Sequence, residues 1–126
     1  MDIVSIANKL GEIATVTSVE QDVYEIITGA KINGKTPLKI YLVKDGNVIK
    51  LCDKKNTLKY MNQMYELKSI DVKNCITAVI KLYGFSISSG ELCANIKSEL
   101  TLKEVFYNYI ICVGQLVNMY AFFDNP

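Results

Sequence analysis

The sequence predicts an α+β fold, in which an antiparallel β-meander carries helices packed on one face and a long C-terminal helix runs through the core. The first half of the chain has short runs rich in β-branched residues, separated by turn residues. The second half has segments with apolar residues three and four positions apart. Half of the 126 residues are apolar, so residues 1–126 are expected to form a single domain that buries a core without disulfides or metal.

The first half is expected to hold a short helix and four strands. Apolar residues spaced three and four apart after Asp2 predict a helix that ends near Gly11. Alternating and β-branched runs predict strands over residues 15–19, 23–28, 38–43 and 48–51. Asp45-Gly46 lies between the last two runs and predicts a hairpin, because glycine tolerates positive φ. Asn33-Gly34 predicts the preceding turn, so the first half is an antiparallel meander.

The apolar period changes to that of helices after Asp53. A short helix with Leu58, Met61 and Tyr65 is expected, capped by Asp53, Asn56 or Thr57. Asp71 is expected to cap the next helix, and Gly84 to end it. The predicted inward face of that helix consists of Val72, Cys75, Ile76, Val79, Leu82 and Tyr83. Residues 88–91 predict a second hairpin turn.

The C-terminal segment, residues 101–123, predicts a helix that is uncharged from Val105 onward. Thr101 and Glu104 have the spacing of a capping box at its start. Its wide apolar face consists of Leu102, Val105, Phe106, Tyr109, Val113, Leu116, Val117 and Tyr120, and its narrow polar stripe of Glu104, Asn108, Gln115 and Asn118. A core helix is the first interpretation. A partner helix seated on the amides, which would give a homodimer through this segment, is the second. The amides, Gly114 and the absence of a lysine cluster beside the run argue against a membrane span.

Composition narrows the chemistry by what is missing. All 14 basic residues are lysines, against 13 acidic residues, and the chain has no Arg, His or Trp. Without His, the chain lacks the commonest general base and metal ligand, and without Arg it lacks the side chain that forms paired hydrogen bonds to phosphate or guanine. Many enzyme classes and an electrostatic nucleic-acid footprint are therefore disfavoured, and no cofactor is implied. Cys52, Cys75, Cys93 and Cys112 lie among apolar neighbours without a secretory signal, so we expect reduced core thiols in a cytoplasmic protein.

One resemblance extends over roughly Thr15 to Phe123. The run of residues 48–53, the run of residues 78–87 that contains Tyr83-Gly84, and the step Gly90-Glu91-Leu92 resemble the bacterial and prophage family catalogued as domain of unknown function 1828. The family tends to carry Thr-Asp-Asp-Gly near its first helix, where this chain has Cys52-Asp53-Lys54-Lys55 and matches only at Asp53. The resemblance implies a phage or mobile-element setting and no established activity.

A short motif suggests nucleotide binding. Gly29, Gly34, Lys35 and Thr36 satisfy the pattern G-x-x-x-x-G-K-[ST] of phosphate-binding loops. A phosphate-binding loop opens into a helix, however, whereas Pro37 and an alternating strand pattern follow Thr36. We therefore interpret these residues as a hairpin loop and keep nucleotide binding as an alternative function.

The remaining polar residues give one candidate surface. Lys54, Lys55, Lys59 and Tyr60 gather lysine and aromatic character around the short helix, which suggests a patch for a protein partner. The carboxylates Asp22, Glu25, Asp45 and Asp53 match no metal loop and are interpreted as solvated charges at strand ends. The sequence thus favours a non-catalytic protein-binding module of phage origin, acting as an inhibitor or adaptor of a host protein, over nucleotide binding or weak nucleic-acid binding.

Overall fold

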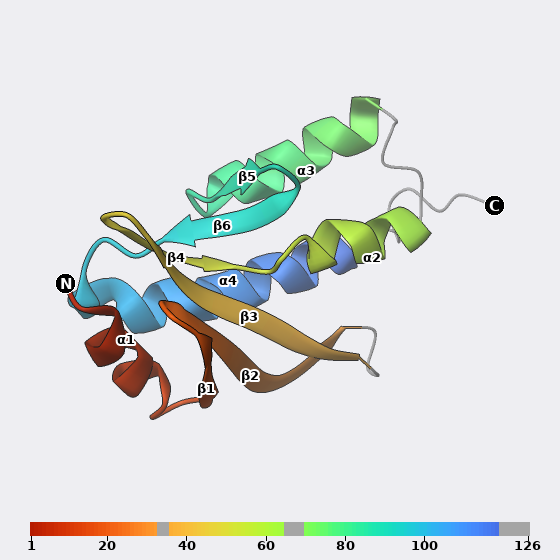
Figure 1. Ribbon diagram of the computed structural model, residues 1–126. Coiled ribbons are helices and arrows are strands. Elements are labelled where there is room, and N and C mark those ends of the chain that lie inside the picture. Colours follow the sequence, from red (N-terminus) through yellow and green to blue (C-terminus); the bar gives the residue numbers. More distant parts are fainter. Residues whose placement is uncertain (33–35, 65–69, 119–126) are drawn as a thin grey trace.

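A six-stranded antiparallel sheet forms the centre of the fold (Figure 1). The structure, a computed structural model, describes residues 1–32, 36–64 and 70–118. The strand order is β1-β2-β3-β4-β6-β5. The strands are β1 (Thr15–Glu20), β2 (Val23–Ile32), β3 (Thr36–Asp45), β4 (Val48–Cys52), β5 (Ser86–Ser88) and β6 (Glu91–Asn95). The meander β1–β4 and the hairpin β5–β6 are thus joined along one edge, β4 against β6, and the predicted α+β class is confirmed.

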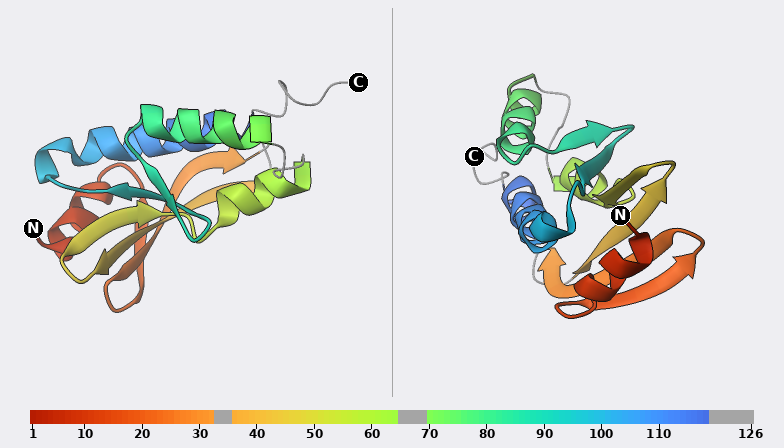
Figure 2. Two further views of the ribbon diagram at one scale, coloured as in Figure 1. Left: turned by 90° about the horizontal axis from the view of Figure 1, so that it is seen from above. Right: turned by 90° about the vertical axis from the view of Figure 1, so that its left-hand side faces the viewer.

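The four helices contribute to one core together with the sheet. They are α1 (Ile3–Leu10), α2 (Asn56–Met64), α3 (Ile70–Leu82) and α4 (Leu102–Val117). Helices α3 and α4 lie behind the sheet in Figure 1, and the turned views show them along one side of it (Figure 2). Buried residues from all four helices form one cluster with Ile26, Ile40, Leu42 and Leu51 of the sheet. None of the described helices is both long and apolar enough to cross a membrane.

Helix α4 is the long core helix that the sequence predicts. Phe106, Tyr109, Cys112, Val113 and Leu116 are buried within the main cluster. Tyr107 and Ile111 are about half exposed, at 49% and 50%, and share the outward side with the predicted polar stripe. The described helix ends at Val117, so Tyr120 and the rest of the predicted segment lie outside the described residues.

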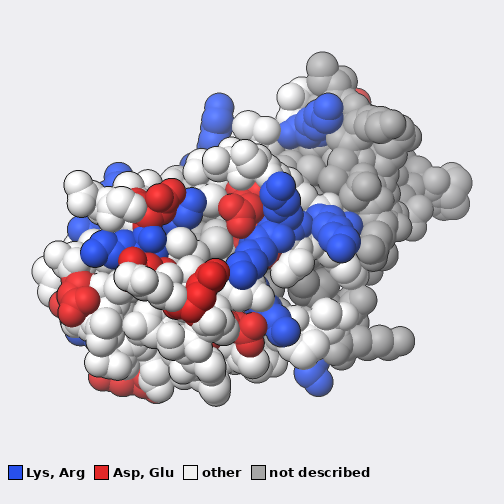
Figure 3. Space-filling view, in the orientation of Figure 1, with Lys and Arg blue, Asp and Glu red and all other residues white. Residues whose placement is uncertain are grey.

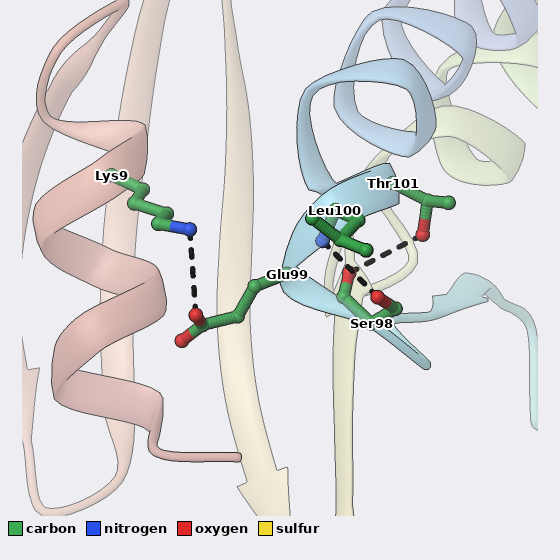
Figure 4. Close-up of polar contacts among 5 residues, drawn as sticks. All are labelled: Lys9, Ser98, Glu99, Leu100 and Thr101. Atoms are coloured by element: carbon green, nitrogen blue, oxygen red, sulfur yellow. Dashed lines mark hydrogen bonds and ion pairs between the residues drawn. The ribbon is translucent and has the colours of Figure 1, made fainter.

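The cap of α4 differs from the predicted capping box. Thr101 makes no side-chain capping bond; its Oγ1 donates to the Ser98 carbonyl oxygen at 3.2 Å instead. Ser98 Oγ accepts from the Leu100 amide at 3.1 Å, which begins the 3-10 turn η1 (Glu99–Thr101) three residues before the expected cap (Figure 4). Figure 4 also shows Lys9 of α1 paired with Glu99 at 3.4 Å. The short turn therefore ties the start of α4 to α1.

Helix α3 buries part of the predicted inward face. Val72, Ile76 and Ile80 are buried, whereas Cys75 is exposed and Leu82 is 76% exposed. The predicted face is therefore confirmed at Val72, Ile76, Val79 and Tyr83, which are buried or packed against the core, and wrong at Cys75 and Leu82. Asp71 lies within the first turn rather than at a cap. Gly84 ends the helix as predicted: its φ is +74°, and the Phe85 amide donates to the Ile80 carbonyl oxygen at 3.1 Å.

The remaining hairpins agree with the sequence. β3 and β4 pair around Asp45 and Val48, with Gly46 at φ +61°. β5 and β6 pair from Ser88 and Glu91, with Ser89 at φ +52° and Gly90 at φ +82°. Two successive positive φ angles give a two-residue turn whose twist matches that of the strands.

Candidate functional site

One face of the sheet is left uncovered by the described helices, and we call it the open face. Alternation along a strand sends Leu42 and Leu51 into the main core and their neighbours Tyr41 and Cys52 to the other side. Tyr41 pairs with Glu25 on β2 and with Cys52 on β4, so these three residues form a row across the open face. This face is turned toward the viewer in Figures 1 and 3.

A second apolar cluster lies at the centre of the open face. It consists of Tyr41, Cys52 and Cys93, packed by the half-buried Val23 and Val43; we call it the thiol–tyrosine cluster. Ile27 and Val48, on the same side of their strands, are 39% and 45% exposed. The cluster itself is buried, so the apolar surface that this face offers to solvent consists of the aliphatic residues around it. Apolar residues bordered by charged ones are typical of a protein contact surface.

Lys54 borders this cluster, and the side chain of Lys55 lies beside Gly90 of the β5–β6 turn; both lysines have unusual backbone angles. Their φ angles are +50° and +70°, a region that non-glycine residues rarely adopt. This turn places the Lys54 ammonium 4.3 Å from the centroid of the Tyr41 ring. Burial and the neighbouring carboxylate of Glu25 raise the pKa of Tyr41, so the phenol stays protonated beneath the lysine. The lysine thus forms a cation–π contact at the edge of the open face.

Lys59 and Tyr60 line a hollow between α2 and the start of β3. Its volume is about 560 Å³, and its walls are Thr36, Pro37, Leu38, Lys39, Asn56, Lys59 and Tyr60. Lys39 belongs both to this hollow and to the strand that carries Tyr41 two positions further on. The four predicted patch residues therefore divide into two adjoining groups, with Lys54 and Lys55 beside the cluster and Lys59 and Tyr60 in the hollow.

The side chain of Asp53 stabilises the turn that contains Lys54 and Lys55 by accepting hydrogen bonds from main-chain amides. This side chain is fully buried, so its interpretation as a solvated strand-end charge is wrong. Its Oδ1 accepts from the Lys55 amide at 3.0 Å and the Leu92 amide at 3.2 Å, and its Oδ2 accepts from the Thr57 amide at 3.0 Å. Of the caps considered from the sequence, Asp53 is the one observed to accept from the first turn of α2.

A residue of α4 also binds the main chain of β6 at Leu92. Tyr109 donates its hydroxyl to the Leu92 carbonyl oxygen at 2.7 Å, so both polar groups of the Leu92 backbone are bound by buried side chains. Burial raises the pKa of Tyr109 well above its ordinary value, which keeps the hydroxyl a donor. Asp53, Leu92 and Tyr109 therefore link β4, β6 and α4 at one point, and the spacing of these residues in the sequence does not indicate the link.

The glycine-rich motif has a strand on both described sides. Gly29 lies in β2 with φ +83°, and Thr36 begins β3 and pairs with Ile32. Gly34 and Lys35 lie outside the described residues. The motif continues into a strand rather than a helix, so the hairpin interpretation is confirmed and the helix N-terminus that a phosphate-binding loop requires is replaced by β3.

Three of the four cysteines are buried, and Cys75 is the exception to the prediction. Burial raises the pKa of Cys52 to about 11 and that of Cys112 to about 12. The pKa of Cys93 is also raised by burial, although the charge of Lys50 partly opposes this. Among the described residues, no three His, Cys, Asp or Glu side chains are grouped so that they could hold a metal ion.

Comparisons of the chain with family models, curated proteins and solved structures find no match. The resemblance to the domain of unknown function 1828 family accordingly stays a prediction. The functional proposal therefore rests on the open face, the hollow and their chemistry.

Charge on the open face is mixed. Lys39, Lys50, Lys54 and Lys55 are accompanied on this side by Glu25, Asp45 and Glu91. Figure 3 shows basic and acidic side chains interspersed over this side of the molecule. Nucleic-acid surfaces concentrate positive charge along one stripe, so this mixture is more typical of a protein contact surface.

Proposed function

We propose that the protein is a non-catalytic binding module that docks a partner protein on the open face. The observation that carries the proposal is a sheet face that no described helix covers, on which the exposed Ile27 and Val48 surround the buried thiol–tyrosine cluster. Apolar surface of this kind is stabilised by removal from water, and the lysines at its margin supply the polar rim of a protein interface.

The partner's class is inferred from the same surface. Lys54 and Lys55 are exposed at one end of the cluster, and Lys39 at the hollow. A partner that places carboxylates over these lysines and apolar side chains over Ile27 and Val48 is therefore complementary. A role as an inhibitor or adaptor of a host protein in a phage or mobile-element setting is part of this proposal, and rests on the family resemblance.

A nuclease-treated pull-down from a bacterial lysate, read by mass spectrometry, tests the proposal. We expect one stoichiometric protein partner with the wild-type protein, and its loss with the charge reversal Lys55→Glu or with Tyr60→Ala. Lys55 is exposed, which makes its reversal the milder structural change. If both variants retain the partner, the surface next to α2 is not the contact. Loss of all captured material on nuclease treatment indicates nucleic-acid binding instead.

The hollow supports a second candidate, an anionic small molecule. Lys39 and Lys59 contribute two ammonium groups to a space of about 560 Å³, within the range of small-molecule sites. Calorimetry with ATP and GTP in the presence of magnesium tests whether a nucleotide is that anion. Heat that saturates in the wild type and is lost in Lys59→Ala supports it, and no binding at millimolar nucleotide refutes it.

The homodimer through α4 is a separate proposal. The half-exposed Tyr107 and Ile111 lie on the outward side of the helix and would form the centre of such an interface. Light scattering over a range of protein concentrations tests it. A mass that doubles with concentration, and that Ile111→Glu holds at the monomer value, supports the dimer, whereas a constant monomer mass refutes it.

A further inference from the structure

Two cysteines that are 41 positions apart in sequence become cross-strand neighbours through the pairing of β4 with β6. The register pairs Lys50 with Asn95 and Leu51 with Ala94. Continued by one residue, the same register puts Cys52 opposite Cys93, and both side chains belong to the thiol–tyrosine cluster. The two thiols are close enough to interact electrostatically, since the charge of the Cys93 thiolate contributes to the raised pKa of Cys52.

The hydrogen bonds between β4 and β6 show whether Cys52 and Cys93 are a hydrogen-bonded or a non-hydrogen-bonded pair of the antiparallel ladder. The Ile96 amide donates to the Ile49 carbonyl oxygen at 2.8 Å, so these two residues form a hydrogen-bonded pair in the antiparallel ladder. Hydrogen-bonded and non-hydrogen-bonded pairs alternate along such a ladder, which makes Cys52 and Cys93 a non-hydrogen-bonded pair. In such pairs the Cα atoms lie about 4.5 Å apart, within the range of roughly 4.4–6.8 Å that a disulfide spans.

We propose that Cys52 and Cys93 are a site of reversible oxidation, in which a low-molecular-weight disulfide such as oxidised glutathione converts the two thiols to a cross-strand disulfide. The thiolate of one cysteine attacks the small disulfide, which forms a mixed disulfide and releases one small thiol. The second cysteine then attacks the mixed disulfide at the protein sulfur and releases the second small thiol. Two protein thiols are oxidised and one small disulfide is reduced to two thiols.

The surroundings assign the two roles. The charge of Lys50 lowers the pKa of both thiols, but only at Cys93 is it the largest effect after burial; at Cys52 the charge of Glu91, which raises the pKa, comes next after burial. We therefore assign Cys93 the first attack and Cys52 the second. Cys112 is buried between α4 and the sheet, and Cys75 is exposed on α3, so neither is a cross-strand neighbour of another cysteine. Because burial raises the thiol pKa values, the reaction proceeds through a small thiolate fraction and accelerates with pH.

Oxidation would bind the two parts of the sheet covalently. The β1–β4 meander and the β5–β6 hairpin meet only along the short ladder between β4 and β6 in the described residues. The disulfide would close the loop that contains α2 and α3 and fix the centre of the open face. This inference does not depend on the proposed function, because it requires no partner.

The test exposes the reduced full-length protein to oxidised glutathione at pH 8.5 under native conditions. We expect a mass loss of about 2 Da, a tryptic fragment that joins the Cys52 and Cys93 peptides, and a rise of roughly 10 °C in the thermal midpoint that dithiothreitol reverses. The variant Cys75→Ser, which removes the exposed thiol, should give the same three results.

Two outcomes would overturn the proposal. One is a glutathione adduct on Cys75 with Cys52 and Cys93 still reduced after prolonged oxidation of wild type. The other is a disulfide that involves Cys75 or Cys112 in preference to the Cys52–Cys93 pair. Cys93→Ser should abolish the mass loss and the shift in midpoint; an unchanged shift in that variant would also count against the assignment.

Discussion

Asp53→Asn is expected to destabilise the fold strongly, although it changes one atom of the side chain. The wild-type carboxylate is fully buried and accepts from three amides, of Lys55, Thr57 and Leu92. An asparagine that keeps its oxygen toward Lys55 and Leu92 points an amide donor at the Thr57 amide. One charge-assisted bond is lost and one buried N–H has no acceptor, which we estimate at about 2–4 kcal/mol in the free energy of unfolding.

Urea unfolding followed by far-ultraviolet circular dichroism measures this loss. The matched control is Asp45→Asn, which makes the same chemical change at an exposed position of the β3–β4 hairpin and should alter the free energy by less than about 0.5 kcal/mol. The chain as a whole is expected to have only about 5–15 kcal/mol of stability, so the difference between the variants is large. Equal effects of the two substitutions would refute the role assigned to Asp53.

Three further predictions concern buried groups. Tyr109→Phe removes the hydroxyl bound to the Leu92 carbonyl oxygen and should cost about 1–2 kcal/mol in urea unfolding; no change would show that the bond is not formed. Thr57→Val should leave stability unchanged or raise it by about 1 kcal/mol in the same assay, because Thr57 Oγ1 is buried without a hydrogen-bond partner among the described residues. The free energy of unfolding should also depend on pH: it should be highest below pH 9.0, the ordinary pKa of a thiol, and fall toward pH 12. Folding raises the pKa of Cys52 to about 11 and that of Cys112 to about 12, so between these pH values the folded chain keeps two protons that the unfolded chain releases. A thermal midpoint that is constant from pH 8 to 10.5 would contradict this prediction.

Local chemistry was enough to predict most of the elements. The Asp45-Gly46 turn and the end of α3 are predictable because Gly46 and Gly84 have positive φ angles, which favour glycine whatever the rest of the fold does. The strands of the meander are readable because neighbouring strands in sequence pair with each other. The prediction for helix α3 is wrong at Cys75 and Leu82 because the helix carries apolar residues on two sides, and only packing against β5 and α4 selects one of them.

The candidate site depends on contacts that sequence spacing does not contain. Asp53 was recognised as a possible cap, but its burial depends on the Leu92 amide, which is 39 residues away. Cys52 and Cys93 were recognised as buried thiols, and their pairing depends on the crossover that brings β6 beside β4. The sequence did contain one signal: each cysteine is two positions from a charged or polar residue of its own strand, Lys50 for Cys52 and Glu91 for Cys93, and therefore lies on the same side of the sheet as that residue.

Partner binding by two matched variants tests the docking surface most directly. Ile27→Glu places a charge on the open face, and Ile111→Glu places the same charge on the outward side of α4; the wild-type residues are 39% and 50% exposed. With the captured partner in a titration, we predict at least about a tenfold loss of affinity for Ile27→Glu and wild-type affinity for Ile111→Glu. Full affinity in Ile27→Glu together with loss in Ile111→Glu would contradict the account and move the contact surface to α4.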